Sequence, residues 1–187
     1  MYDGGPSYST TSDIASPSSW TSPKSLASNG PANWLDHWVI CDSVNCYLFF
    51  SADDGKFYRM QTTIGNFPGG GGSYSVVMED ATADHLFEAS NVYKIGGTGK
   101  YLALIEAFDS DSMGRRFFRS WTADTLDGTW TALADTYRVP FASAANVTFS
   151  ATAWTNDISH GEMIRDGYDE TLTMIESRSG AAKTLSA

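Results

Sequence analysis

The sequence predicts an all-β chain, and three observations support this fold class. No segment of the 187 residues carries a long apolar stripe at helical spacing. Short apolar or alternating runs recur instead, and turn sequences such as Asp53-Asp54-Gly55 and Asp127-Gly128 separate them. Aromatic residues make up 13% of the chain, a share that suits the cores of packed sheets.

Two groups of four strands are expected along the chain. In each group three strands follow one another across short turns, and a fourth strand forms the outer edge. The flexible glycine run at 69–72 precedes the outer strand of the first group. The expected strands are 38–42, 46–51, 56–62 and 74–78, then 87–95, 100–108, 116–122 and 129–133.

A repeat underlies these two groups. Segments 8–13, 58–63 and 118–124 each place an aromatic-bearing strand before a Ser/Thr-rich turn. Their starts are 50 and then 60 residues apart, a period near the roughly 40–50 residues of one four-stranded propeller blade. Two repeats, 33–80 and 85–134, look whole, and each end of the chain supplies part of another. The sequence therefore predicts a β-propeller of about three to four blades whose ring is not closed.

Charge and composition exclude several classes of partner. The chain has 12 basic and 22 acidic residues and a net charge of −10, which argues against nucleic acid because phosphate contacts need Lys/Arg clusters. No apolar run approaches the about 20 residues of a membrane span. The first residues, 1–6, lack the basic start and apolar core of a signal peptide.

Two carboxylates stand where apolar strands begin. Asp36 opens the run 35–41, and Glu88 lies inside 86–93, about one repeat further on. A carboxylate is costly among apolar neighbours unless it is paired or used, so the pair suggests an acid/base site on the inner strands. The alternatives are that Asp36 caps a turn and that Glu88 is the buried ion-pair partner of Arg116 or Arg119.

Cys41 and Cys46 flank a four-residue turn and face each other across a predicted hairpin. A disulfide there would close a very small loop and constrain the unfolded chain little. Two free buried thiols, or a bond to a partner outside this chain, are equally open. A zinc site is excluded because no second Cys/His pair is near.

Five motifs follow one another along the chain: Trp34-Leu35-Asp36-His37-Trp38, Tyr47-Leu48-Phe49-Phe50-Ser51, Ile64-Gly65-Asn66-Phe67-Pro68, Leu86-Phe87-Glu88-Ala89 and Ile158-Ser159-His160-Gly161-Glu162. Together they resemble a known family, the α-L-arabinofuranosidases of glycoside hydrolase family 62. The similarity runs from about residue 8 to about residue 173, in order and with few gaps. It implies a five-bladed propeller that removes arabinofuranosyl side groups from arabinoxylan, and from arabinan, with inversion at the anomeric carbon.

The resemblance implies a role for each of the two carboxylates. Glu88 matches the general acid, which protonates the glycosidic oxygen as the xylan chain leaves. Its apolar flank suits this role, because desolvation favours a protonated carboxyl. Asp36 matches the carboxylate that orients the acid and tunes its proton affinity.

Three further residues are expected at the site. Residues 157–164 are predicted to form the innermost strand of a further blade, which would place His160 near the propeller axis. His160 matches a histidine by the active site and a central metal ion, usually calcium, so it is a predicted substrate-binding residue and metal ligand. Calcium prefers oxygen ligands, and a core histidine is the alternative. Trp34 and Leu35 precede Asp36 and are predicted to line the sugar pocket, with a plain core position as the alternative for Trp34. The chemistry itself needs no cofactor.

The chain also departs from the family pattern. An inverting glycosidase needs a second carboxylate as general base. That base would lie upstream of Tyr2, and Asp3 and Asp13 match no base motif. The predicted domains are a partial propeller catalytic domain at 1–176 and a non-homologous polar tail at 177–187.

The resulting expectation is a secreted, monomeric arabinofuranosidase that acts on arabinoxylan or arabinan and binds neither nucleic acid nor membrane. Its general base is missing from this chain. The alternative is a truncated, inactive propeller that at most binds arabinose-bearing glycans. A protein-binding propeller is disfavoured, since such a scaffold has no need of acids at strand starts.

Overall fold

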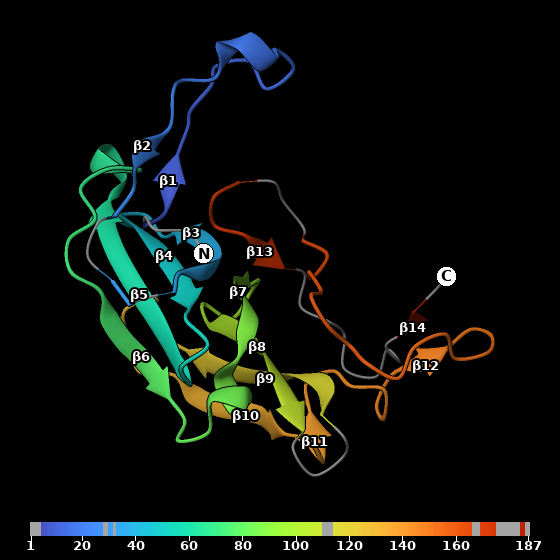
Figure 1. The fold of residues 1–187 in the computed structure, drawn as a ribbon. Coiled ribbons are helices and arrows are strands. Elements are labelled where there is room, and N and C mark those ends of the chain that lie inside the picture. The colour runs from blue at the N-terminus through green and yellow to red at the C-terminus, as the bar shows by residue number, and fades with distance from the viewer. Residues whose placement is uncertain are drawn as a thin grey trace.

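A computed structural model describes residues 5–27, 30–31, 33–109, 114–165, 169–174 and 184–185. Across these ranges the regular structure consists of strands and three short 3₁₀ helices (Figure 1). The predicted all-β fold is therefore confirmed. No helix among the described residues is both long enough and apolar enough to span a bilayer.

The first large sheet is an antiparallel meander in the order β3-β4-β5-β6. Every residue of β4 after Asn45 is buried, because the strand runs through the middle of the sheet with both faces covered. β6 lies at the edge and is mostly exposed. The bounds are β3 (Leu35–Cys41), β4 (Asn45–Ser51), β5 (Lys56–Thr63) and β6 (Ser75–Glu79), with the 3₁₀ helix η2 (Ile64–Asn66) after β5.

The second large sheet has the order β11-β10-β9-β8-β7-β13. Its neighbours are antiparallel except β13, which pairs in parallel with the end of β7. The 3₁₀ helix η3 (Ala83–Leu86) leads into the sheet. The strands are β7 (Glu88–Ile95), β8 (Tyr101–Asp109), β9 (Arg115–Ala123), β10 (Thr131–Thr136), β11 (Val139–Pro140) and β13 (Thr173–Met174).

All eight predicted strands are present in these two sheets. The largest differences are at the first, which begins at Leu35, and the last, which ends at Thr136. Two small pairs lie outside the sheets. β1 (Ser7–Tyr8) and β2 (Lys24–Ser25) form an arm that carries η1 (Pro17–Ser19) and projects away from the first sheet (Figure 1). β12 (Thr148–Phe149) pairs in parallel with β14 (Thr184–Leu185).

Aromatic side chains join the two large sheets. Phe49 on β4 is fully buried, stacks on Phe57 with ring centroids 5.3 Å apart, and meets Trp130 edge-on at 6.1 Å. At the strands where the sheets meet, Trp38 Nε1 of β3 donates a hydrogen bond to the carbonyl oxygen of Val92 on β7, at 2.7 Å. The two sheets therefore share one core.

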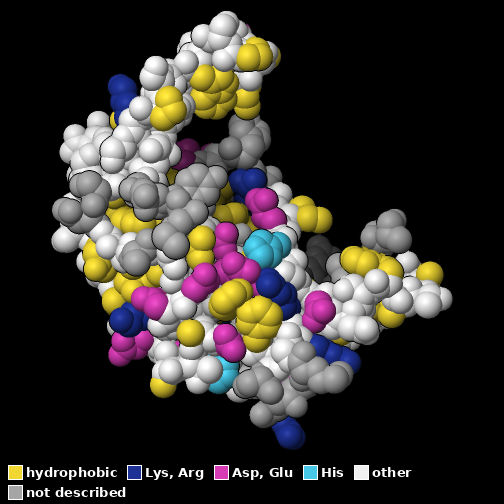
Figure 2. All heavy atoms as spheres, in the orientation of Figure 1, with side chains coloured by type: hydrophobic (Ala, Val, Ile, Leu, Met, Phe, Trp, Pro, Cys, Tyr) yellow, Lys and Arg dark blue, Asp and Glu magenta, His cyan; other side chains and the backbone are white. Residues whose placement is uncertain are grey.

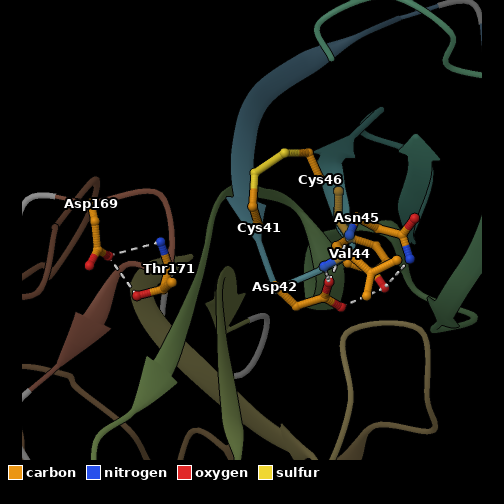
Figure 3. The surroundings of a disulfide bond; sticks show 8 residues. Cys41, Asp42, Val44, Asn45, Cys46, Asp169 and Thr171 are labelled. Carbon is orange, nitrogen blue, oxygen red and sulfur yellow. Dashed lines mark hydrogen bonds between the residues drawn. A yellow bond between two sulfur atoms is a disulfide. The ribbon is translucent and has the colours of Figure 1, made fainter. Parts of the chain in front are cut away.

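The two cysteines form a disulfide, which resolves the alternatives left open by the sequence (Figure 3). Cys41 and Cys46 are cross-strand partners at the end of the β3–β4 hairpin. Asp42 Oδ1 accepts hydrogen bonds from the amides of Val44 and Asn45, both at 2.8 Å, and so closes the turn between them. The Cys41 amide donates to the carbonyl of Glu170, at 2.8 Å, which fixes the segment 169–174 beside the hairpin.

One expected strand is wrong. Residues 157–164 were predicted as the innermost strand of a further blade, but they form an irregular segment. Two of their backbone amides bind side chains and not a neighbouring strand. The His160 amide donates to a Glu106 carboxylate oxygen and the Met163 amide donates to the Tyr93 hydroxyl, both at 3.0 Å. Of the predicted tail 177–187, only Thr184–Leu185 lies within the described residues.

The shared core gives a first prediction. Replacing Phe49 by alanine should lower the free energy of unfolding by about 3–5 kcal/mol, because the ring is fully buried between the sheets. Val44→Ala is the control, since Val44 is 61% exposed at a turn and should change stability by no more than about 0.5 kcal/mol. Urea unfolding measures both. Equal losses in the two variants would contradict the position given to Phe49.

Candidate active site

The two carboxylates predicted from the sequence converge with the predicted histidine. One side-chain ligand atom from each of Asp36, Glu88 and His160 lies within 4.8 Å of the others. Asp36 is the second residue of β3, Glu88 begins β7, and His160 lies in the irregular segment 157–164. The convergence brings together three parts of the chain that are far apart in sequence.

Each of these segments bends sharply at the site. Asp36, Ala89 and His160 have φ angles of 48°, 50° and 45°, the left-handed region that residues with a Cβ adopt only at a cost of roughly 1–2 kcal/mol each. Both ladders are irregular here as well, between Leu35 and Trp38 and between Glu88 and Asn91. Such strain persists only where surrounding contacts impose it.

One of those contacts joins the two sheets. Asp36 Oδ2 accepts a hydrogen bond of 2.6 Å from the amide of Ala89, the residue after Glu88. The Ser90 hydroxyl donates to the Asp36 carbonyl oxygen at 3.4 Å. Asp36 therefore does not cap a local turn, which was the alternative, but binds the backbone of the neighbouring sheet beside Glu88.

Glu88 forms an ion pair, as its alternative interpretation expected. Arg116 Nη1 on β9 lies 2.9 Å from Glu88 Oε1, and the Glu88 side chain is 19% exposed. Arg119, the other partner considered, binds Asp80 and Asp135 instead. The ion pair and a catalytic role are compatible, because the carboxyl still reaches solvent.

Sequence reasoning missed Glu106, which lies directly behind this ion pair on β8. Its carboxylate is fully buried and accepts hydrogen bonds from Arg116 Nη1, from the Ser159 hydroxyl at 2.7 Å and from the His160 amide at 3.0 Å. The signal was the one that singled out Glu88, an acid inside an apolar strand, here within 101–108.

The environment of Arg116 is strongly anionic and aromatic. Burial by itself lowers the pKa of Arg116, but hydrogen bonds and charges from Glu88 and Glu106 outweigh it and raise the pKa above its ordinary value. The guanidinium carbon lies 4.6 Å from the ring centroid of Phe108 and 5.7 Å from that of Phe87. Figure 2 shows acidic, basic, histidine and apolar side chains gathered together on this face.

A cavity of about 260 Å³ opens beside Asp36 and His160, and Glu88 is not among the residues that line it. It lies between the starts of β3 and β7 and the segment that carries His160. Its lining includes His37, which sequence reasoning did not single out. The lining residues are Asp36, His37, Trp38, Ala89, Ser90, Asn91, His160, Gly161 and Glu162.

Trp34 and Leu35 are not among the residues that line this cavity. The Trp34 ring stacks on Phe50 with centroids 4.3 Å apart and packs against the core cluster on that face of the first sheet. Of the other acids considered, Asp3 lies outside the described residues, and Asp13 accepts a hydrogen bond from the Ala15 amide in the arm.

The donor set does not fit calcium. Asp36, Glu88 and His160 offer two carboxylates and one imidazole, whereas calcium takes about six to eight oxygen ligands. Asp36 Oδ2 and Glu88 Oε1 already accept hydrogen bonds, and the Arg116 cation lies against Glu88. We therefore derive no step through a metal ion.

Carboxylates that converge near an open cavity are suited to proton transfer on a bound substrate. Comparison with known proteins indicates the class of enzyme. The family model for glycosyl hydrolase family 62 matches residues 2–178. Alpha-L-arabinofuranosidase C of Cellvibrio japonicus (strain Ueda107) is 51% identical over 170 residues, which are 89% of this chain and 27% of that protein.

Two solved structures are also similar. The catalytic domain of the Coprinopsis cinerea family 62 α-L-arabinofuranosidase shares 49% identity at a TM-score of 0.85, over 92% of this chain and 56% of that one. A family 62 hydrolase in complex with xylotriose shares 42% identity at a TM-score of 0.84, over 93% and 58%. The chain belongs to glycosyl hydrolase family 62, and it spans little more than half of these solved relatives.

Asp53, in the turn between β4 and β5, is an exposed residue that lies close enough to the site to feel its charges. Partial loss of water around its carboxyl, and then the charges of Glu88 and Asp36, raise the pKa of Asp53 above its ordinary 3.8. An acid with a raised folded-state pKa costs stability once it is ionised. That cost is absent below the unfolded pKa and complete above the folded one.

Asp53→Asn should therefore raise the melting temperature at pH 7, and the gain should vanish near pH 3. Asparagine also tolerates the left-handed φ of 55° at this position. Asp54→Asn is the matched control, because Asp54 Oδ2 accepts a 2.6 Å hydrogen bond from the Tyr58 hydroxyl and its loss should lower the melting temperature. Calorimetry at both pH values measures this. A gain for Asp53→Asn that persists at pH 3 would exclude the electrostatic cause.

Proposed function

We propose that this chain is part of an inverting α-L-arabinofuranosidase that releases arabinofuranosyl side chains from arabinoxylan and from arabinan. The observation that carries the proposal is the convergence of Asp36, Glu88 and His160 beside a cavity in a member of family 62. A related hydrolase in complex with xylotriose supports a xylan backbone as the group that leaves. The enzyme is proposed to act as a secreted monomer.

Glu88 is the proposed general acid. Its carboxyl is partly open to solvent, stands beside Phe87 and lies near the cavity-lining residues Asp36 and His160. From there it would donate its proton to the glycosidic oxygen, so that the xylan hydroxyl leaves as a neutral alcohol. Water attacks the anomeric carbon from the opposite face of the sugar and gives the inverted arabinose.

Asp36 is the proposed orienting carboxylate. Its hydrogen bond to the Ala89 amide fixes the backbone immediately after Glu88, and its charge lies within the same small cluster, from which it would tune the proton affinity of the acid. His160, which lines the cavity, is proposed to bind the arabinofuranosyl group. Trp34 and Leu35 are proposed to support the wall around Asp36 from the neighbouring backbone.

The general base and the rest of the fold are proposed to lie in sequence outside this chain. An inverting enzyme needs a second carboxylate about 6.5–9.5 Å from the acid, on the far side of the sugar. Each large sheet contains a four-stranded antiparallel meander, the unit from which propeller blades are built, and this chain covers only 56% and 58% of two solved relatives. We infer an incomplete five-bladed propeller of about three to four blades.

The alternative function is a catalytically inactive propeller that at most binds arabinose-bearing glycans. The two functions differ in whether Glu88 transfers a proton or only forms the ion pair with Arg116. Both predict binding, and only the first predicts arabinose release.

Glu88→Gln should reduce arabinose release by about 10²–10⁴-fold and leave glycan binding intact, because the amide keeps the shape of the acid without its proton. The measurement is arabinose release from arabinoxylan by a completed chain, extended at both ends with the flanking segments of the Coprinopsis cinerea domain. Binding of an arabinose-substituted xylo-oligosaccharide to the same protein is followed by calorimetry. Glu79→Gln, at the exposed end of β6, is the control and should match the parent. Undiminished release by Glu88→Gln would end the proposed acid role.

A second test concerns the missing base. The chain alone should release little or no arabinose from wheat arabinoxylan. A completed chain, extended at both ends with the flanking segments of the Coprinopsis cinerea domain, should release it readily. Equal rates for the two proteins would show that the general base lies within the 187 residues.

A further inference from the structure

We propose that Glu106 is a positioning residue for the general acid: it anchors Arg116 and the Ser159–His160 turn, and these hold the carboxyl of Glu88 in place. The inference rests on the proposed function of Glu88. Glu106 does not line the cavity and acts only through its neighbours.

Glu106 is the most deeply buried of the charged residues that contact one another here, namely Glu88, Glu106 and Arg116. Its side chain is 0% exposed, compared with 19% for Glu88 and 31% for Arg116. A carboxylate removed from water is stable only when charges and hydrogen bonds compensate it. The compensation comes from outside its own strand, since Arg116 binds Oε1 and the segment that carries Ser159 and His160 binds Oε2.

Strand register adds a second argument. Glu88 and Glu106 are direct partners in the β7–β8 ladder. Like charges at directly opposed positions repel each other, so the pair is tolerable only with a cation between them. Arg116 supplies that cation, because a single nitrogen, Nη1, contacts one carboxylate oxygen of each glutamate.

His160 spans the same two carboxylates. Its Nδ1 lies 3.4 Å from Glu106 Oε2, and its Nε2 lies 4.0 Å from Glu88 Oε1. The Ser159 hydroxyl, 3.0 Å from Nδ1, also binds Glu106. The buried Glu106 carboxylate thus stabilises the left-handed backbone at His160 by accepting hydrogen bonds from the His160 amide and the Ser159 hydroxyl.

Arg116 does not serve Glu88 alone. Its Nη1 divides its hydrogen bonds between Glu88 and Glu106, and Glu106 does not line the cavity. The other charged groups that face Glu88 are Asp36 from β3, Asp53 from the β4–β5 turn and His160.

Glu106→Gln distinguishes the contact that Glu106 makes with Arg116 from the contacts that it makes with Ser159 and His160. Its carbonyl oxygen can still accept from Ser159 and His160, but its amide then turns N–H donors toward Arg116. Glu106→Asp is the conservative variant, which keeps the charge. Glu79→Gln controls for the loss of one negative charge elsewhere on the chain.

The first measurement uses this chain and needs no activity. We expect slowly exchanging guanidinium protons of Arg116 in NMR spectra, assigned by their loss in Arg116→Lys. They should persist in Glu88→Gln and Glu79→Gln and be lost in Glu106→Gln. If the slowly exchanging Arg116 protons persisted in Glu106→Gln, Glu106 would not hold Arg116 in place and the proposal would fail.

The second measurement is kinetic and uses whichever form releases arabinose, this chain or the completed chain. Glu106→Gln should be slowed about 10²-fold or more on an arabinose-substituted xylo-oligosaccharide, whose leaving group needs a proton. On 2,4-dinitrophenyl α-L-arabinofuranoside, whose leaving group needs none, it should stay within a few-fold of the parent. Glu106→Asp should recover part of the loss.

The outcomes separate the two proposals. If Glu106→Gln slows both substrates equally, Glu106 is only structural and the inference fails. If Glu88→Gln itself shows no dependence on the leaving group, the acid role of Glu88 fails, whatever the Arg116 spectrum shows.

Discussion

The hydrogen bond from the Ala89 amide to the Asp36 carboxylate is the contact on which the site depends. It joins the second residue of β3 to the second residue of β7, at 2.6 Å, where both strands depart from regular strand geometry. Ala89 cannot adopt its left-handed φ without cost, and it directly follows Glu88. The side chain of one sheet therefore sets the direction in which the carboxyl of the other sheet points.

The charged side chains around that contact are paired with one another. Glu106 binds Arg116 and His160 from behind, and Arg116 packs on the rings of Phe87 and Phe108. Buried charges of this kind stabilise a fold little, because desolvation offsets their attraction. Their value lies in geometry, since a carboxyl held from several sides is ready to act on a substrate without rearrangement.

Much of this could be predicted from the sequence, and the misses have physical causes. Asp36 and Glu88 stood out because acids inside apolar strands are rare, and the same signal at Glu106 was passed over. The strand expected at 157–164 is absent because side chains, not a neighbouring strand, bind its amides. Periodicity cannot reveal left-handed turns at residues with a Cβ, nor that one Arg116 nitrogen would bridge two glutamates from different strands.

The most direct test of the central claim is a crystal structure of the completed chain carrying Glu88→Gln, with an arabinose-substituted xylo-oligosaccharide bound. We expect the arabinofuranosyl ring in the cavity beside Asp36 and His160, with the glycosidic oxygen about 2.6–3.2 Å from the side chain at position 88. A sugar bound elsewhere, or Asp36 and position 88 turned away from each other, would contradict the account.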